Sequence, residues 1–348
     1  MDSNTPMVMK ETKNRIRVDY EGKLSFKERM KAKLKASNTW IRVAINVVRF
    51  LLMLGISYVI LYPFFARIAS SFMTKEDLID PTVALIPKNF TLDTYKYIII
   101  ENQYFKALFT TAGIALMCAL VQTFIACMIG YGLSKFKFKG NTAVLLAVVI
   151  TMVIPPAAVE VALYRHFALF DLGRVLAWDY KGIIELIIGK TPDLTNTIVP
   201  FLIISFCGLA FKNGLYIYMM RQFFKGVPDE LEESAYVDGS GVFRTFFQII
   251  LPLSVPMMIT IFLFSFSWQW TDQFYVEQFV PNYATMPTLF DTIPQTLLPD
   301  SSTFSGRALY ESAIRNTSSL LIIFPLVIIY LFCQKYLVQG IERSGLVG

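Results

Sequence analysis

The chain has 348 residues, of which 55% are hydrophobic and only 17% are charged, and its formal net charge is +6. Soluble domains usually carry about a quarter charged residues, so this composition excludes an ordinary soluble protein. Together with a mean hydropathy of +0.51, it predicts an all-α polytopic membrane protein.

Six apolar stretches are long enough to cross a membrane, since about 20 residues of helix span a hydrocarbon core of about 30 Å. They lie near residues 43–66, 107–131, 143–164, 197–220, 256–279 and 318–336. No other segment has the composition to build a large soluble core. We therefore expect one six-helix membrane domain over residues 43–336, with a basic segment at 1–42 and a tail at 337–348.

The first 40 residues are polar and lack the apolar run that follows the basic patch of a signal peptide. Within them, Phe26, Met30 and Leu34 recur at a spacing of four, with lysines around them, which predicts an amphipathic helix. Such a helix can lie on the anionic inner leaflet or dock against a protein, and the sequence leaves both readings open.

Lys and Arg residues near the ends of the spans predict the orientation of the chain. They are concentrated in residues 1–42, in the loop "SKFKFKGN", in the loop between the fourth and fifth spans, and in the tail. Both termini are therefore expected in the cytoplasm. The outer segments near 68–106, 165–196 and 280–317 are long, so they either bind something or cap the helix bundle.

The sequence contains no recognisable cofactor, metal or catalytic site. Gly189-Lys190-Thr191 does not fit a phosphate-binding loop, because that loop needs a glycine five residues before its Gly-Lys pair and residue 184 is Ile. The four cysteines lie in predicted spans, and the single histidine, His166, has no partner at metal-binding spacing. We expect no cofactor, and no intramembrane enzyme, since no catalytic pair is visible.

Several polar and aromatic residues fall inside the predicted spans, where charges are costly and usually face an interior or a water-filled path. The candidates for a solute pathway are Glu160, Lys212, Trp268, Trp270 and Asp272. They combine aromatic faces with hydrogen-bonding groups, as sugar sites do. Alternatively, Lys212 extends toward the membrane surface and Trp270 belongs to an interfacial aromatic belt.

The stretch "DELEESAYVDGSGVFRTFFQIILPL" at 229–253 lies between the fourth and fifth spans. Pro228 suits the first position of a helix, and the acidic residues that follow it favour the positive end of the helix dipole. Gly239 suits the helix end. An anionic leaflet repels an acidic helix, so Glu230 and Glu233, which share one face, predict a basic protein partner.

A second helix is expected directly after this one. Phe243, Phe246, Phe247 and Ile250 recur at the spacing of one helical face, which predicts an amphipathic segment. We expect Pro252 to end it, with the fifth span opening at Pro256.

The same stretch resembles the "EAA" loop of permease subunits in binding-protein-dependent ABC importers. That pattern is Glu-Ala-Ala, three residues, Gly, nine residues, Ile, one residue, Leu-Pro. The chain has Glu233-Ser234-Ala235, Gly239, Ile249 and Leu251-Pro252 at these intervals, with the small residue Ser234 as the one departure.

Other segments extend the resemblance over roughly residues 45–348. "YGLSKFKFKG" is similar to the family's loop between the second and third spans, and "QKYLVQGIERSGLVG" resembles the tail of the maltose-type second permease. There are two departures. The outer loop near 172–193 is longer than usual, and Trp270-Thr271-Asp272 replaces the family's Trp-Asn-Asp.

The resemblance implies the type I ABC importer permease fold (MetI-like), in a bacterial plasma membrane, and a subunit for carbohydrate or oligosaccharide uptake. The helix near 228–237 would be the coupling helix, seated in an ATPase cleft, with Glu233 paired to a basic residue there and Gly239 forming the turn. The residues implied in ATPase coupling are Glu230, Glu233, Ser234, Ala235, Asp238, Gly239, Ile249, Leu251 and Pro252.

The implied partners are a second permease, two cytoplasmic ATPase subunits, an extracytoplasmic solute-binding protein and membrane lipids, without nucleic acid. ATP would be hydrolysed in the separate ATPase subunits, so the chain itself would be a transporter subunit and no enzyme. A permease for glycerol-phosphate-type compounds remains an alternative. A stand-alone secondary transporter is a further alternative. Such a transporter would have internal repeats and pairs of acidic residues at the membrane midplane, and neither is visible in the sequence.

Overall fold

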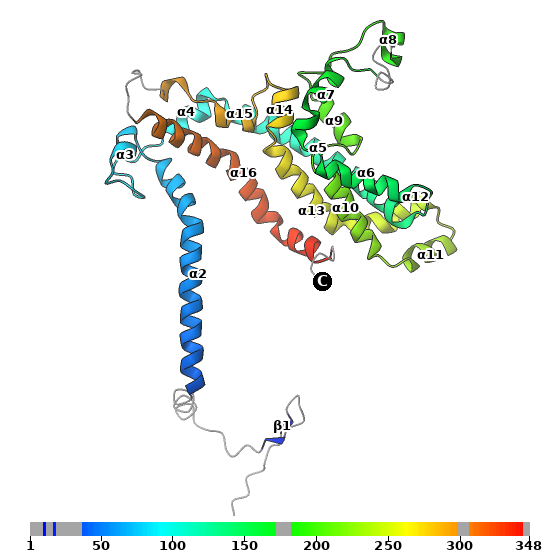
Figure 1. The fold of residues 1–348 in the computed structure, drawn as a ribbon, viewed down its shortest axis with the longest axis horizontal. Helices are drawn as coiled ribbons and strands as arrows, with labels where there is room; N and C mark the ends of the chain where they lie inside the picture. Colours follow the sequence, from blue (N-terminus) through cyan, green and yellow to red (C-terminus); the bar gives the residue numbers. More distant parts are fainter. Residues whose placement is uncertain (1–9, 12–16, 19–36, 172–181, 298–305, 344–348) are drawn as a thin grey trace, which may run out of the picture. The chain divides into compact units, whose positions relative to one another are not determined.

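The computed structural model describes residues 10–11, 17–18, 37–171, 182–297 and 306–343 (Figure 1). The chain divides into two compact units, Met1–Ala66 and Arg67–Gly348, which are described separately. The predicted amphipathic helix around Phe26, Met30 and Leu34 lies outside the described residues, as do residues 172–181 of the enlarged outer loop.

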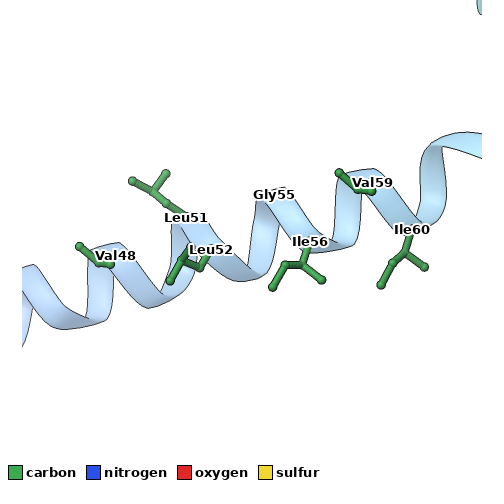
Figure 2. A pocket seen from close by; sticks show the side chains of 7 residues that line it. All are labelled: Val48, Leu51, Leu52, Gly55, Ile56, Val59 and Ile60. Carbon is green, nitrogen blue, oxygen red and sulfur yellow. The ribbon is translucent and has the colours of Figure 1, made fainter.

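The first unit contains a two-residue antiparallel pair, β1 (Lys10–Glu11) and β2 (Arg17–Val18), and most of helix α2 (Ser37–Ser70). Helix α2 contains the predicted first span. Around Gly55 its apolar side chains leave a shallow hollow, because glycine has no side chain there (Figure 2). All seven lining residues belong to this one helix and none is polar, so the hollow is a feature of an apolar helix surface rather than a solute site.

The described part of the second unit is built from helices and one isolated bridge between Met73 and Phe90. The helices are α3 (Lys75–Ile79), α4 (Asp93–Glu101), α5 (Tyr104–Lys135), α6 (Asn141–Val153), α7 (Pro156–Ala168), α8 (Ile183–Ile188), α9 (Val199–Phe206), α10 (Asn213–Lys225), α11 (Glu230–Val237), α12 (Val242–Thr245), the π-helix η1 (Phe246–Ile250), α13 (Leu251–Trp270), α14 (Phe274–Phe279), α15 (Met286–Asp291), the 3-10 helix η2 (Gln295–Leu297) and α16 (Arg307–Arg343).

Among the described residues, four helical segments are long and apolar enough to cross a membrane. They are Val43–Ser70, Tyr104–Lys135, Val242–Trp270 and Arg307–Leu337. These segments contain or overlap the predicted first, second, fifth and sixth spans. Four of the six predicted spans thus have a helix of suitable length and composition, and the total of six is not confirmed. The third and fourth predicted spans have a different structure.

The predicted third span, 143–164, is bent by 102° between α6 and α7. Pro155 and Pro156 lie at the bend, where neither residue has an amide hydrogen to continue the α6 hydrogen-bond ladder. If this bent pair is one span, the described residues contain five. The predicted fourth span, 197–220, is interrupted, because α9 ends at Phe206 and α10 begins only at Asn213.

The expectation that Pro252 ends a separate amphipathic helix is wrong. Residues 242–270 form one helical run, in which the π-helical turn η1 joins α12 to α13. The amide of Leu251 bonds to the carbonyl of Phe246, one residue further back than in an α-helix. Pro252 follows directly after this wider turn, so the helix continues although Pro252 has no amide hydrogen to donate.

Helix α5 is the centre of the second unit and packs against α9, α10 and α13, while α13 also packs against α16 (Figure 1). Small residues on α5 allow this close packing. At Gly130, for example, an added Cβ would lie only 2.6 Å from the Cβ of Met220 on α10. The adjoining core includes Cys127, Phe224 and Ile250, all fully buried.

A buried polar network also joins three helices of this unit. The side-chain amide of Gln122 on α5 donates to Ser205 on α9 at 3.0 Å, and its oxygen accepts from Ser265 on α13 at 2.6 Å. Hydrogen bonds between helices are favoured in a membrane, where the polar groups lack water. The network therefore fixes the positions of α9 and α13 relative to α5.

Candidate functional site

Helix α11 is the acidic helix that the sequence predicts in the loop after the fourth span. It begins at Glu230, two residues after Pro228, and ends at Val237, close to the expected 228–237. Glu230 and Glu233 are exposed, whereas Glu232 and Ala235 are buried. The helix therefore has an outer acidic face and an inner face that packs on the rest of the unit.

The end of α11 is a Schellman motif. The amide of Ser240 donates to the carbonyl of Ala235 at 2.9 Å, and the amide of Gly239 donates to Tyr236 at 3.0 Å. Gly239 has a φ of +80°, and a Cβ added there would meet nothing within 4 Å. Glycine is favoured here by backbone conformation alone, because left-handed geometry is costly for other residues.

Lys135, the last residue of α5, holds the start of this loop. Its ammonium group donates to the carbonyl of Val227 at 2.6 Å and to the carboxylate of Asp229. It also lies 3.8 Å from Oε1 of Glu232, an ion pair too long for a hydrogen bond. Only 7% of the Lys135 side chain is exposed, so these contacts are better shielded from water than those of a surface ion pair.

Tyr131, one helical turn before Lys135, binds the other oxygen of Glu232. Its hydroxyl donates to Oε2 at 3.1 Å. Its ring packs against Phe224 of α10 and Phe246 of η1, with centroid distances of 5.5 and 5.0 Å. We call Tyr131, Lys135, Asp229 and Glu232 the latch, because together they fasten α11 to the end of α5.

The latch also affects the ionisation of Asp229, which lies in the loop outside the predicted spans. The hydrogen bond from Lys135, followed by the positive charge of Lys135, holds the pKa of the Asp229 carboxyl below its ordinary value. Most of the Asp229 side chain is exposed to solvent. This pair therefore contributes less than the better-shielded contact between Lys135 and Glu232.

Sequence reasoning treated Lys135 only as a basic residue of a cytoplasmic loop and Glu232 only as a first-turn acid. A signal was present, since Tyr131 and Lys135 are four residues apart and therefore share one face at the end of α5. Glu232 likewise shares a face with Ala235, three residues later. The sequence does not show that these two faces meet.

The remaining residues that the resemblance implies in ATPase coupling have mainly structural contacts. Ile249 and Leu251 pack against the core that contains Phe224 and Ile250. The amide of Asp238 donates to the carbonyl of Ser234 at 3.1 Å, and the Ser234 hydroxyl donates to the carbonyl of Leu231, also at 3.1 Å. The second half of the motif thus anchors the loop to the membrane domain, and α11 presents the outer surface.

Of the five candidates for the solute pathway, the structure brings Lys212 and Trp268 together. The ammonium group of Lys212 lies 4.7 Å from the centroid of the Trp268 ring. Lys212 is exposed, and 50% of Trp268 is exposed. This is a cation–π contact between the start of α10 and the end of α13.

The other three candidates make different contacts. Trp270 is only 2% exposed, and its indole donates to the carbonyl of Ile322 on α16 at 2.9 Å, so it packs inside the unit. Asp272 accepts the amide hydrogen of Tyr275 in the first turn of α14. Glu160 on α7 is exposed, and its main-chain oxygen accepts from Gln278 at 2.6 Å.

Comparison with known proteins identifies the family of this site. A family profile described as "Binding-protein-dependent transport system inner membrane component" matches residues 122–343, which include the latch, α11 and the pair Lys212 and Trp268.

Two relatives and one solved structure are similar along most of the chain. The polygalacturonan/rhamnogalacturonan transport system permease protein YtcP of Bacillus subtilis is 27% identical, over 86% of this chain and 96% of its own length. The arabinooligosaccharides transport system permease protein AraQ of Bacillus subtilis is 26% identical, over 88% and 96%. A chain of a bacterial ABC transporter for import of the acidic polysaccharide alginate has the same fold, with a TM-score of 0.62, 18% identity and coverage of 91% and 99%.

Proposed function

Because the chain belongs to the family of binding-protein-dependent transport system inner membrane components, we propose that it forms half of the translocation pathway of an ATP-driven importer of carbohydrate oligomers. It is a multi-pass protein of the bacterial plasma membrane and a transport subunit rather than an enzyme. The relatives named for transport of polygalacturonan/rhamnogalacturonan and of arabinooligosaccharides support a carbohydrate substrate.

The family works with separate ATPase subunits and a binding protein. In the proposed complex this chain pairs with a second permease, two ATPases dock on the cytoplasmic side, and the binding protein delivers solute from outside. Both termini lie in the cytoplasm, as the distribution of Lys and Arg predicts. The tail from residue 337, which continues α16 as far as Arg343, reaches toward the ATPases.

Helix α11 is the proposed contact with the ATPase. Its exposed acidic residues, Glu230 and Glu233, face away from the inner surface that holds Glu232 and Ala235. Carboxylates on an exposed helix suit a cleft lined by Arg or Lys, where charge-assisted hydrogen bonds form. In this arrangement Glu233 pairs with a basic residue of the ATPase.

The latch is the observation that best supports coupling through this helix. When the ATPases close, they displace α11, and the contacts of Lys135 and Tyr131 transmit that displacement to α5. Helix α5 in turn carries α9 and α13 through the buried contacts of Gln122. A movement at the cytoplasmic loop thus reaches the helices that line the proposed pathway.

The proposal is tested with the purified complex in proteoliposomes, by measuring uptake of labelled oligosaccharide with ATP on the ATPase side. We expect uptake to require ATP and the binding protein, and Glu233→Gln to reduce uptake while the protein still inserts into the membrane. If the chain alone transports solute without ATP, it is a secondary transporter and the proposal is wrong.

A further inference from the structure

The interruption between α9 and α10 falls inside the predicted fourth span, 197–220, and packs against α5. Ala210, within the interruption, packs in the same buried cluster as Cys118, which is near the middle of α5. Gly208 and Lys212 at the two ends of the interruption have positive φ angles of 72° and 63°. Irregular backbone at this depth is tolerated where it is buried in protein or lines a water-filled cavity.

Lys212 brings a positive charge to this position. Its side chain extends over the Trp268 ring and is exposed, and it makes no ion pair with an acidic residue in the part of the chain that the structure describes. A charged side chain at mid-membrane depth is costly against lipid, so such residues face a bundle interior, a partner or a water-filled path. Left-handed backbone at a lysine is also uncommon and tends to be found at functional sites.

The residue after Lys212 adds a second polar group at the interruption. Asn213 is fully buried, and its side-chain nitrogen and oxygen find no hydrogen-bond partner among the described residues. Nearly all buried polar groups in folded proteins are paired, so an unpaired amide needs an explanation. Polar groups at a broken span are typical of the binding sites of transporters.

We propose that Lys212 and Trp268 form a solute-contacting subsite of the pathway, and that this subsite favours an anionic oligosaccharide built from uronate residues. The ammonium group would form a charge-assisted hydrogen bond with a sugar carboxylate. The exposed part of the indole offers an electron-rich face to the C–H groups of the sugar ring. This inference rests on the proposed function, because it assumes a carbohydrate importer.

The positive charge of Lys212 favours binding of an anionic sugar over a neutral one. A neutral sugar needs only hydrogen-bond donors, which an uncharged amide supplies without placing a charge at this depth. Lysine gains its additional interaction only when the ligand carries a negative charge. The alternative partner for the Lys212 ammonium group is an acidic side chain of the second permease.

The test measures equilibrium binding of labelled probes to the whole complex. A hydrolysis-deficient ATPase keeps the complex in its ATP-bound state, so the binding protein is not needed to deliver the probe. The two labelled probes are trigalacturonate and its methyl ester, which has the same sugars without the charges. We expect the wild-type complex to bind trigalacturonate about tenfold more tightly than the ester. Lys212→Met should abolish this preference, Lys212→Arg should keep it, and Lys190→Met, in an exposed loop, should not affect it.

Trp268→Leu gives an independent check, because it should weaken binding of both probes without changing the preference for charge. Equal binding of the two probes by the wild type, or an unchanged preference in Lys212→Met, would overturn the inference. The inference would also be overturned if the second permease dissociated from the Lys212→Met complex but not from the Lys212→Arg complex. Lys212 would then form an ion pair with that subunit. If the complex takes up only neutral oligosaccharides with ATP, the subsite is refuted and the proposed function remains intact. If it takes up no carbohydrate, the proposed function is refuted.

Discussion

The ammonium group of Lys135 lies 3.8 Å from the Glu232 carboxylate, and the two side chains are only 7% and 10% exposed. One residue ends a long apolar helix, and the other lies on the inner face of the short helix α11. Charges that are shielded from water in this way depend on each other, because removing one leaves the other buried without a counter-charge. This pair is the mechanical connection on which the coupling proposal depends.

Lys135→Met should uncouple the transporter. Glu232 would lose its counter-charge, and we expect a destabilisation of about 3–5 kcal/mol, together with a lower ratio of solute transported to ATP hydrolysed. The measurements are the thermal unfolding midpoint of the complex and its coupling ratio. Lys137→Met is the matched control, since Lys137 is exposed and two residues away. If both variants behave as wild type, the latch has no role.

Combining Lys135→Met with Glu232→Gln should restore part of the stability that Lys135→Met loses, because the unpaired carboxylate is then gone. The double-mutant cycle of unfolding midpoints measures this interaction. Strictly additive effects of the two substitutions would mean that the residues do not interact.

Tyr131→Phe should have a smaller effect than Lys135→Met. The phenyl ring keeps the packing against Phe224 and Phe246, but the hydrogen bond to Glu232 is lost. A hydrogen bond to a charged group contributes about 1.5–3 kcal/mol, and Lys135 still provides a counter-charge. The coupling ratio should fall moderately, and a ratio lower than that of Lys135→Met would show that Tyr131 acts in some other way.

Gly239→Ala should reduce coupling through backbone strain alone. Its φ of +80° costs an L-residue about 1–2 kcal/mol, although a Cβ there has open space. Gly239→Asn should recover part of the activity, because asparagine tolerates left-handed geometry. Gly241→Ala is the control, since Gly241 has a φ of −79° and open space for a Cβ. Equal uptake by all three variants would exclude a requirement for this turn.

The ion pair between Asp229 and Lys135 should persist at mildly acidic pH. Because the folded-state pKa of Asp229 lies below its ordinary value of 3.8, its contribution is present above that value and is lost as pH falls through the lower folded-state pKa. A spin label at Val237→Cys should report constant α11 mobility from pH 7 down to about 4. The mobility of α11 should increase only below about pH 4. In Asp229→Asn this increase should be smaller, because the variant has no Asp229 carboxyl to protonate.

Sequence patterns predicted those features that depend on neighbouring residues. The bounds of α11 follow from Pro228, the acidic first turn and Gly239, all within a dozen residues of each other. The helix that continues through Pro252 was not predicted, because a π-helical turn shifts the hydrogen bonds just before the proline. The latch was not predicted either, since Tyr131 and Glu232 are 101 residues apart in the chain and meet only in the folded unit.

The two tryptophans of α13 show the same limit. Trp268 and Trp270 are two residues apart, so they point in directions about 200° apart around the helix. One must therefore face outward when the other faces the core, but composition alone does not reveal which. The structure buries Trp270 against α16 and leaves Trp268 exposed beside Lys212.

The coupling of α11 to ATP-driven uptake is tested most directly by comparing wild type and Lys135→Met in proteoliposomes that contain the whole complex. The quantity to measure is labelled oligosaccharide taken up per ATP hydrolysed. We predict that wild-type uptake requires ATP, and that Lys135→Met continues to hydrolyse ATP but takes up several-fold less solute per ATP. Wild-type uptake without ATP, or an unchanged ratio in Lys135→Met, would contradict this account.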